Sequence, residues 1–288
     1  MTSPEVLFRA CRPRQWVKNL LVLTAPVAAG VVTQPKAMLG AAVAIVAFCL
    51  ASSGIYLVND IRDVESDRAH VSKSRRPIAS GELPVSTAWI LALVLLALAL
   101  LAAGLQSPKL LAVLAIYEAI QLWYCLGMKN EPVIELTSVA SGFLLRAIAG
   151  GVASDVALSQ WFLTAAGFGS LFMAGGKRYA ELMLVERTGA KIRPVLARYT
   201  APYLRFVWTL SAGVLVTTYA LWAFSMGQTG GNSWSVVSVV PFVIALLRYA
   251  VDVDSGQAGE PEEIVLHDRM LLALAGVWGA TLVLSVYF

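Results

Sequence analysis

The sequence predicts an all-α integral membrane protein with nine transmembrane helices and a cytoplasmic N-terminus. Three observations lead to this fold class. Of the 288 residues, 58% are hydrophobic and only 14% are charged, and the mean hydropathy is +0.71. Such a composition is typical of a chain that crosses a membrane many times. The other two observations are the length of the apolar runs and the side on which the basic residues fall.

The segment before the first span, residues 1–16, is predicted to form a short helix at the membrane surface. It interleaves apolar side chains with Arg9, Arg12 and Arg14 and leads to Trp16, a residue type that favours the headgroup level. A secretory signal peptide would also begin with basic residues. Here, however, the polar stretch is long and the first apolar run leads directly into a second, so we expect the segment to be retained.

Nine apolar runs are long enough to cross a bilayer. No long soluble segment remains between them, so we expect one polytopic domain over 1–288. The longest connections are expected at about 59–85, 177–201 and 252–268. The predicted spans are 17–34, 37–58, 86–106, 108–126, 132–152, 159–176, 202–225, 235–251 and 269–288.

The basic residues support this count. When the chain is threaded with its N-terminus inside, 22 Lys and Arg residues are distributed among the segments. Of these, 19 are assigned to the inner segments and inner ends of the spans, Lys36 and Lys109 lie in outer segments, and Arg146 lies within a span. This asymmetry fits the positive-inside rule and would be lost if a helix were missed or invented. The three long loops, and any chemistry they carry, are therefore expected on the cytoplasmic side.

A stripe of acidic residues is predicted at the inner end of the second span. With 100° per residue, Asn59, Asp60, Asp63 and Asp67 fall on one narrow face of a helix, over roughly 12 Å. Like charges at these spacings repel one another, and a divalent cation would remove the conflict. Only oxygen ligands are offered, which suits Mg²⁺ shared with a substrate phosphate. The alternative is a solvated acidic face at the end of a membrane helix.

Cations follow the acidic stripe closely. Lys73, Arg75 and Arg76 come next along the chain, and together with a bound Mg²⁺ they would suit a diphosphate ligand. The alternative is ordinary positive-inside charge that attracts anionic lipid.

The spacing Asn59-Asp60-x-x-Asp63-x-x-x-Asp67, followed by Arg76-Pro77-Ile78-x-x-Gly81, resembles the first signature of the UbiA superfamily of membrane prenyltransferases. The resemblance implies a UbiA-type helical bundle with nine spans. It also implies that Asn59, Asp60, Asp63 and Asp67 bind Mg²⁺, which grips a diphosphate leaving group. The three aspartates would be the catalytic residues.

The second signature of that superfamily, an aspartate-rich run after the sixth span, is altered here. The acids are reduced to Glu181 and Glu186, and the pair Lys177-Arg178 is present instead. A site with fewer carboxylates and more cations should bind less metal and more phosphate. With these departures from the signature, the chain resembles an actinobacterial branch of the superfamily. That branch transfers the phosphoribosyl group of phosphoribosyl diphosphate to decaprenyl phosphate for cell-wall arabinan synthesis at the inner membrane.

That resemblance implies two binding regions for the donor: a metal clamp for its diphosphate and a cationic pocket for its 5-phosphate. Partners would be phosphoribosyl diphosphate and a polyprenyl phosphate; we expect no nucleic acid and leave homo-oligomerisation open. The residues expected to bind substrate are Lys18, Asn59, Lys73, Arg76, Tyr124, Lys129, Lys177, Arg178 and Glu181.

Two alternatives remain at this point. The same fold could transfer a polyprenyl chain to an aromatic or other small acceptor. A transporter with ionisable residues along its pathway is the third reading, although the acidic stripe lies at one membrane face only. Two charges within spans, Glu118 and Arg146, are expected to pair with each other.

Overall fold

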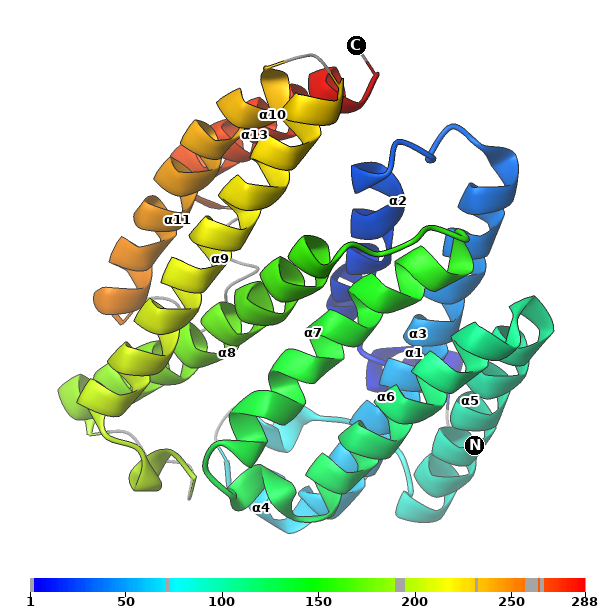
Figure 1. Ribbon diagram of the computed structural model, residues 1–288. Coiled ribbons are helices and arrows are strands. Elements are labelled where there is room, and N and C mark those ends of the chain that lie inside the picture. The colour runs from blue at the N-terminus through cyan, green and yellow to red at the C-terminus, as the bar shows by residue number, and fades with distance from the viewer. Residues whose placement is uncertain are drawn as a thin grey trace. The chain divides into compact units, whose positions relative to one another are not determined.

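The computed structural model describes residues 3–70, 73–189, 195–230, 233–256, 264 and 267–287. Within these ranges the regular elements are all helices, joined by short turns (Figure 1). The predicted loop 252–268 lies partly outside the described residues. The helices are α1 (Pro4–Ala10), η1 (Pro13–Leu23), α2 (Thr24–Ala28), α3 (Pro35–Arg62), α4 (Val64–Arg68), η2 (Lys73–Arg75), α5 (Val85–Gln106), α6 (Pro108–Leu126), η3 (Met128–Asn130), α7 (Ile134–Ala153), α8 (Gln160–Thr188), η4 (Leu196–Arg198), α9 (Ala201–Gly230), α10 (Trp234–Val237), α11 (Val239–Asp254) and α13 (Arg269–Tyr287).

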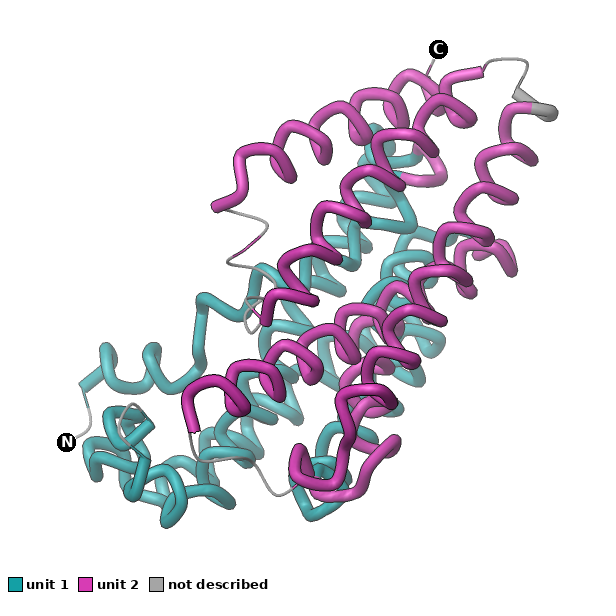
Figure 2. Tube along the Cα trace, turned by 90° about the vertical axis from the view of Figure 1, so that its left-hand side faces the viewer, with its two compact units in different colours: residues 1–27, 31–129, 145–157 teal, residues 28–30, 130–144, 158–288 magenta. Residues whose placement is uncertain are grey.

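The chain forms two compact units, drawn in different colours in Figure 2. Unit 1 comprises residues 1–27, 31–129 and 145–157, and unit 2 comprises residues 28–30, 130–144 and 158–287, with residue 288 outside the described ranges. Each unit has its own buried core. Whether they form the one functional domain expected over 1–288 stays a prediction.

In unit 1, α3 packs against both α5 and α6. Its buried face carries Ala41, Ala44, Ala47 and Ala51, which recur every three or four residues and are fully buried. Small residues at this spacing let neighbouring helices approach closely where no hydrophobic effect drives them together. Proline at the first position starts α3 and α6, where its missing N–H has no intrahelical partner in any case.

Two glycines mark the closest approaches in unit 1. A Cβ at Gly40 of α3 would lie 1.9 Å from the carbonyl oxygen of Ala153. A Cβ at Gly150 of α7 would lie 1.8 Å from the carbonyl oxygen of Val22. Any other residue would push backbone apart at these two points, so the second half of α7 is fixed against both η1 and α3.

In unit 2, α8 packs against α9, and α11 packs against α13. Their shared core includes Phe172, Tyr179, Leu204, Val253 and Leu271. The Oγ of Ser159 accepts a hydrogen bond from the backbone N–H of Phe162 at the start of α8, and Gly189 ends the helix in the left-handed region at φ 65°. Both are common helix boundaries, and they make α8 one continuous helix of 29 residues.

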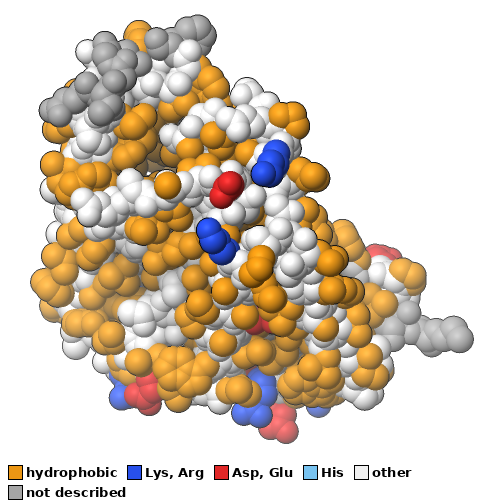
Figure 3. Space-filling model, turned by 45° about the vertical axis from the view of Figure 1, so that its right-hand side comes forward, with side chains coloured by type: hydrophobic (Ala, Val, Ile, Leu, Met, Phe, Trp, Pro, Cys, Tyr) orange, Lys and Arg blue, Asp and Glu red, His pale blue; other side chains and the backbone are white. Residues whose placement is uncertain are grey.

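Seven helices of the described residues are long and apolar enough to span a membrane. They are α3, α5, α6, α7, α9, the α10–α11 pair and α13. The expected count of nine is not confirmed. The predicted span 17–34 is divided between η1 and the five-residue α2. The predicted span 159–176 lies in α8, whose apolar stretch ends where polar side chains begin at Lys177. On the face in Figure 3, hydrophobic side chains are spread over much of the surface and charged side chains are few, which suits contact with lipid.

The N-terminal segment also differs in detail from the expectation. The surface helix predicted over 1–16 is the shorter α1, which Ser3 caps. Arg12 then adopts a left-handed backbone, φ 53° and ψ 60°, directly before Pro13. Because proline disfavours helical conformation in the preceding residue, the chain turns at Arg12 and starts η1 in a new direction.

Candidate active site

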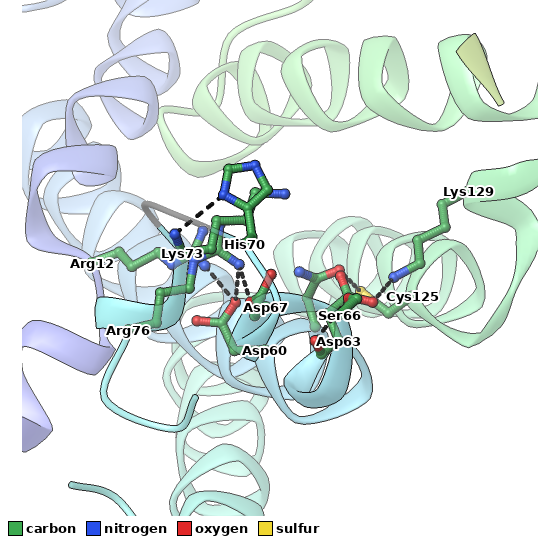
Figure 4. Close-up of polar contacts among 11 residues, drawn as sticks. Arg12, Asp60, Asp63, Ser66, Asp67, His70, Lys73, Arg76, Cys125 and Lys129 are labelled. Carbon is green, nitrogen blue, oxygen red and sulfur yellow. Dashed lines mark hydrogen bonds and ion pairs between the residues drawn. The ribbon is translucent and has the colours of Figure 1, made fainter. Parts of the chain in front are cut away.

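The acidic stripe lies where α3 ends, and the helix does not continue unbroken through it. Asp63 ends α3 and begins α4 with φ −98° and ψ 5°, outside the helical range. The predicted single face therefore divides. Asp60 and Asp67 are turned to one side, whereas Asp63 is turned to another (Figure 4).

The first group of side chains consists of Asp60, Asp67, Arg76 and Arg12. Arg76 Nη1 donates to Asp60 Oδ1 at 3.1 Å and to Asp67 Oδ2 at 2.5 Å. Arg12 also donates to Asp60 Oδ1, and its guanidinium lies 5.1 Å from the ring centre of Tyr56. The carboxylates are buried, with Asp60 5% and Asp67 2% exposed, whereas both arginine side chains are 26% exposed. The acids are held inside and the cations face outward.

The second group joins the same stripe to the end of α6. Lys129 Nζ donates to Asp63 Oδ1 at 2.5 Å, and Cys125 Sγ lies 4.0 Å from Asn59 Oδ1. Both Lys129 and Asp63 are partly exposed, at 22% and 28%. Asn59, Asp63 and Lys129 thus lie together, next to the first group on the same segment of chain.

The donor set fits a magnesium site in its chemistry. Asn59 and the three aspartates supply oxygen atoms only, within nine residues of chain, and Mg²⁺ takes oxygen ligands at about 2.1 Å. The Nη1 atom of Arg76 reaches both Asp60 and Asp67, so a positive group already lies between the two carboxylates. Among the residues that the structure describes, no three Asp, Glu, His or Cys side chains converge as a metal-binding group, because Asp63 faces Lys129 instead.

The other residues of unit 1 that are predicted to bind substrate are Lys18, Lys73 and Tyr124. Lys73 begins η2 and, like Lys18 of η1, is half-buried. The backbone N–H of Lys73 donates to Nδ1 of His70 at 3.4 Å, and Figure 4 shows Lys73 beside Arg76. Tyr124 packs against the apolar core beneath the stripe. Their contacts with substrate stay predictions.

In unit 2, Arg178 is held between two carboxylates. It donates to Glu135 Oε1 through Nε at 2.7 Å and through Nη2, and to Glu181 Oε2 through Nη1 at 2.8 Å. Its side chain is 6% exposed and that of Glu135 is 1% exposed. A guanidinium so enclosed fixes α8 to α7, so its expected phosphate contact finds no support in this geometry. The neighbouring Lys177 is half-buried, and its role stays a prediction.

Tyr199 supports the same part of unit 2. Its hydroxyl accepts a hydrogen bond from the backbone N–H of Val133 at 2.8 Å. Burial raises the pKa of this phenol to about 12, and the nearby Glu135 carboxylate acts in the same direction. The ring therefore stays neutral at any physiological pH and holds the chain just before α7.

The expected pairing of Glu118 with Arg146 is wrong. Arg146 donates through Nε to Asn19 Oδ1 at 2.7 Å and through Nη2 to the Tyr117 hydroxyl at 3.0 Å. Its guanidinium also lies 5.4 Å from the ring centre of Phe48. Adjacent residues on a helix point in directions 100° apart, so a contact with Tyr117 does not bring Glu118 within reach.

A cavity of about 760 Å³ lies between α8 and α9 in unit 2. Met183, Phe206 and Leu210 are among the residues that line it, with Arg205 and Tyr179 at its polar end. Arg205 donates to Asp254 at 3.1 Å and to the Tyr179 hydroxyl. None of the residues predicted to bind metal or substrate lines this cavity.

Two residues of these clusters were not expected from the sequence. The sequence pattern places Arg12 only among the basic residues before the first span, and it gives Glu135 no particular role. Arg12 is 48 positions from its partner Asp60, and Glu135 is 43 positions from Arg178. The left-handed turn before Pro13 was the one local signal that Arg12 departs from an ordinary surface position.

Comparison with known proteins identifies the family of this chain. The family model described as the UbiA prenyltransferase family matches residues 20–284. The chain belongs to the UbiA prenyltransferase family. Like others of this family, it is a multi-pass membrane protein, in keeping with its seven candidate spans.

Among UbiA-family relatives, decaprenyl-phosphate phosphoribosyltransferase of Mycolicibacterium smegmatis is 54% identical over 98% of this chain and 92% of its own length. The protein of the same name from Corynebacterium glutamicum is 52% identical, over 98% of this chain and 86% of its own. Among solved structures, a UbiA homolog from Archaeoglobus fulgidus bound to GPP and Mg²⁺ superposes with a TM-score of 0.73 at 18% identity, covering 98% of this chain and all of the other. The UbiA-type fold, expected from the Asp-rich signature, is confirmed.

Proposed function

We propose that this protein transfers the 5-phosphoribosyl group from phosphoribosyl diphosphate to decaprenyl phosphate and releases diphosphate. The observation that carries the proposal is the identity of more than half of its residues, over nearly the full length, with decaprenyl-phosphate phosphoribosyltransferases. The reaction takes place on the cytoplasmic side of a bacterial inner membrane and serves cell-wall arabinan synthesis. The positive-inside pattern of the sequence supports this orientation, with the N-terminus in the cytoplasm.

Mg²⁺ is the metal that the donor set suits. Asn59, Asp60, Asp63 and Asp67 are the residues that would hold it, and the metal would neutralise charge on the departing diphosphate. Without a substrate, Arg12, Arg76 and Lys129 balance the three carboxylates. All three cations are partly exposed, so they could turn toward phosphate oxygens if Mg²⁺ and a diphosphate occupied the carboxylates.

The protein's own residues then act by positioning and by charge. The acceptor is a phosphate monoester, already an anion at neutral pH, so its oxygen attacks C1 of the ribosyl group without a strong general base. The bond from C1 to the lipid phosphate oxygen forms as the bond from C1 to the diphosphate oxygen breaks. In-line attack on the α-configured donor gives a β product. Lys18, Lys73 and Arg76 supply positive charge near the acidic stripe and favour both phosphate groups.

A second candidate function is the transfer of a polyprenyl chain to an aromatic or other small acceptor. The family name and the GPP-bound homolog favour it. The altered second motif, in which Arg178 is enclosed by Glu135 and Glu181, gives it less support, since few acids remain there for a second metal.

The test is an assay of purified protein with Mg²⁺ in lipid nanodiscs. One arm offers labelled phosphoribosyl diphosphate with decaprenyl phosphate, and the other offers geranyl diphosphate with 4-hydroxybenzoate. We expect a labelled lipid product in the first arm only, and none after chelation of Mg²⁺. Product in the second arm alone would replace the proposed reaction with prenyl transfer.

A further inference from the structure

Glu118 is a buried carboxyl whose Oε1 atom has no hydrogen-bond partner among the residues that the structure describes. It lies on the face of α6 that turns toward the core of unit 1, with Leu114 and Cys125, and is only 6% exposed. Its Oε1 atom is inaccessible and has no hydrogen-bond partner. No hydrogen bond or ion pair joins its side chain to any residue in the described part of the chain. Buried carboxyl groups are normally hydrogen-bonded. The missing hydrogen-bond partner of Glu118 is therefore expected to come from a bound ligand.

The register of α3 and α6 shows where Glu118 lies relative to the acidic stripe. Asp63 contacts Lys129, and Asn59 contacts Cys125; in both pairs the partner is 66 positions later. The two helices therefore run in parallel, side by side. Seven residues are close to two helical turns, so Glu118 lies on the line of Cys125, about 10 Å deeper in the bundle.

Continuing the same register places Glu118 near Ser52 of α3. The Ser52 hydroxyl donates to the carbonyl oxygen of Cys49 at 3.2 Å, within its own helix. The Ser52 hydroxyl proton is therefore already used within α3, so it is not donated to the carboxyl group of Glu118. The side chains around Glu118 on the core face of α6, such as Leu110 and Leu114, are apolar.

We propose that Glu118 binds the ring hydroxyls of the ribosyl group and so selects a sugar diphosphate over a prenyl diphosphate. The proposal rests on the proposed function and names the residue that decides its donor. With its diphosphate at Asp60, Asp63 and Asp67, a donor must extend the group attached to that diphosphate away from the stripe. Toward the interior of the bundle, the face of α6 that carries Cys125 next presents Glu118.

The physical basis is the difference between the two donors at this carboxyl. The 2- and 3-hydroxyls of a ribosyl group donate hydrogen bonds to it, and both its ionised and its protonated forms can accept them. An isoprenyl chain in the same position would leave the carboxyl desolvated and unpaired. Sites built to hydrogen-bond a hydroxyl reject analogues that lack it far more strongly than apolar pockets reject an added group.

The experiment compares wild type with Glu118→Met and Glu118→Gln, and uses Ile116→Met, on the exposed side of the same helix, as the matched control. Initial rates are measured with phosphoribosyl diphosphate and with its 2-deoxy and 3-deoxy analogues. We expect wild type and Ile116→Met to lose about 10- to 100-fold in kcat/KM when a hydroxyl is removed from the donor. Glu118→Met should have a KM for phosphoribosyl diphosphate raised by a similar factor, with the KM for decaprenyl phosphate unchanged. It should no longer distinguish the deoxy donors.

Inhibition by geranyl diphosphate gives a second readout, which we expect to be tighter for Glu118→Met than for wild type. Glu118→Gln keeps the shape of the side chain and one acceptor oxygen. Its inhibition by geranyl diphosphate should therefore be intermediate between those of wild type and Glu118→Met. If Glu118→Met does not fold, the donor preferences of wild type and Glu118→Gln still test the proposal. Wild type that uses ribosyl and deoxyribosyl donors equally well would overturn the proposal, as would a Glu118 variant that loses activity equally for all donors. Wild type with no phosphoribosyl transfer at all would instead refute the proposed function.

Discussion

Unit 1 and unit 2 each contain a cluster of acidic and basic side chains, and the two clusters differ in whether the cation is buried together with its acid. In unit 1, Asp60 and Asp67 are buried, while Arg76 remains 26% exposed. In unit 2, Arg178 is enclosed at 6% exposure by Glu135, which is 1% exposed. The first cluster therefore has cations that can move away from their acids, whereas the second does not.

This difference distinguishes a cluster that can bind a ligand from one that stabilises the fold. A partly exposed ion pair, such as Lys129 with Asp63 in the first cluster, contributes less to stability than a buried pair, so its partners can exchange for a ligand more readily. A buried pair is different, because removing either partner leaves an uncompensated charge in a region of low dielectric constant. We therefore expect mutations in the first cluster to change activity and mutations in the second to change stability.

The largest effect is expected for Asp63→Asn. The substitution removes one charged oxygen ligand of the proposed Mg²⁺ site while keeping the size of the side chain. Turnover should fall by at least about 100-fold, with little change in thermal stability. Product formation from labelled phosphoribosyl diphosphate measures the first quantity and thermal unfolding measures the second. The matched control is Glu65→Gln, an exposed acid two residues away, which should retain activity. Full turnover by Asp63→Asn would remove this residue from the site.

The next largest effect is expected for Glu135→Gln, in unit 2. Removing one partner of the buried pair should cost about 3 kcal/mol or more, which for a chain of this size lowers the unfolding midpoint by roughly 10 °C. Differential scanning fluorimetry of the solubilised protein measures the shift. Glu131→Gln is the control, since its pair with Arg198 is about half exposed and should contribute less than about 1 kcal/mol. Equal shifts for the two variants would contradict the contrast between the clusters.

A smaller effect is expected for Arg76→Lys. The guanidinium of Arg76 reaches Asp60 and Asp67 at once, and an ammonium group cannot reproduce that planar geometry. The KM for the donor should rise about 10-fold while the unfolding midpoint changes little. The same substitution at Arg9, which forms an exposed pair with Glu82, serves as the control. A normal KM for Arg76→Lys would mean that the arginine has no part in holding the diphosphate.

The smallest effect concerns Tyr199 and pH. Because its folded pKa is about 12 and an unfolded tyrosine titrates near 10, its contribution to stability is fully present below about pH 10 and is lost as pH rises toward 12. Tyr199→Phe should abolish this alkaline loss, and at neutral pH it should cost about 1 kcal/mol because the N–H of Val133 loses its acceptor. Unfolding midpoints between pH 8 and pH 12 test both statements. An unchanged alkaline slope in the variant would mean that another group is responsible.

The sequence predicted the class of fold well and the helix count less well. Long apolar runs and one-sided Lys and Arg residues depend only on the membrane, so α3, α5 and α6 begin and end close to the expected residues. The predicted spans 17–34 and 159–176 are not among the seven candidate spans, because the first is divided between η1 and α2 and the second continues into polar side chains from Lys177 onward. Whether these segments span the membrane depends on neighbours that compensate their polar groups, which a single segment cannot reveal.

The candidate site shows the same limit. The Asn59–Asp67 spacing predicted a set of oxygen ligands, and Asp60 and Asp67 do lie together. Asp63 does not lie with them, because the helix breaks there and Lys129 draws its carboxylate toward α6. A periodicity argument assumes a continuous helix, so it has no means of placing a residue at a break.

By itself, then, the sequence determined that the chain is a helical membrane protein and which residue types gather after position 58, because hydropathy and local spacing act over a few turns of chain. Tertiary structure alone decided which charge meets which: Arg12 with Asp60, Arg178 with Glu135, Arg146 with Asn19 and Tyr117. These partners lie tens of residues apart, and only helix packing brings them within hydrogen-bonding distance. Within the described part of the chain, the same packing leaves Glu118 Oε1 buried without a hydrogen-bond partner, which is the basis of the role proposed for it in donor selection.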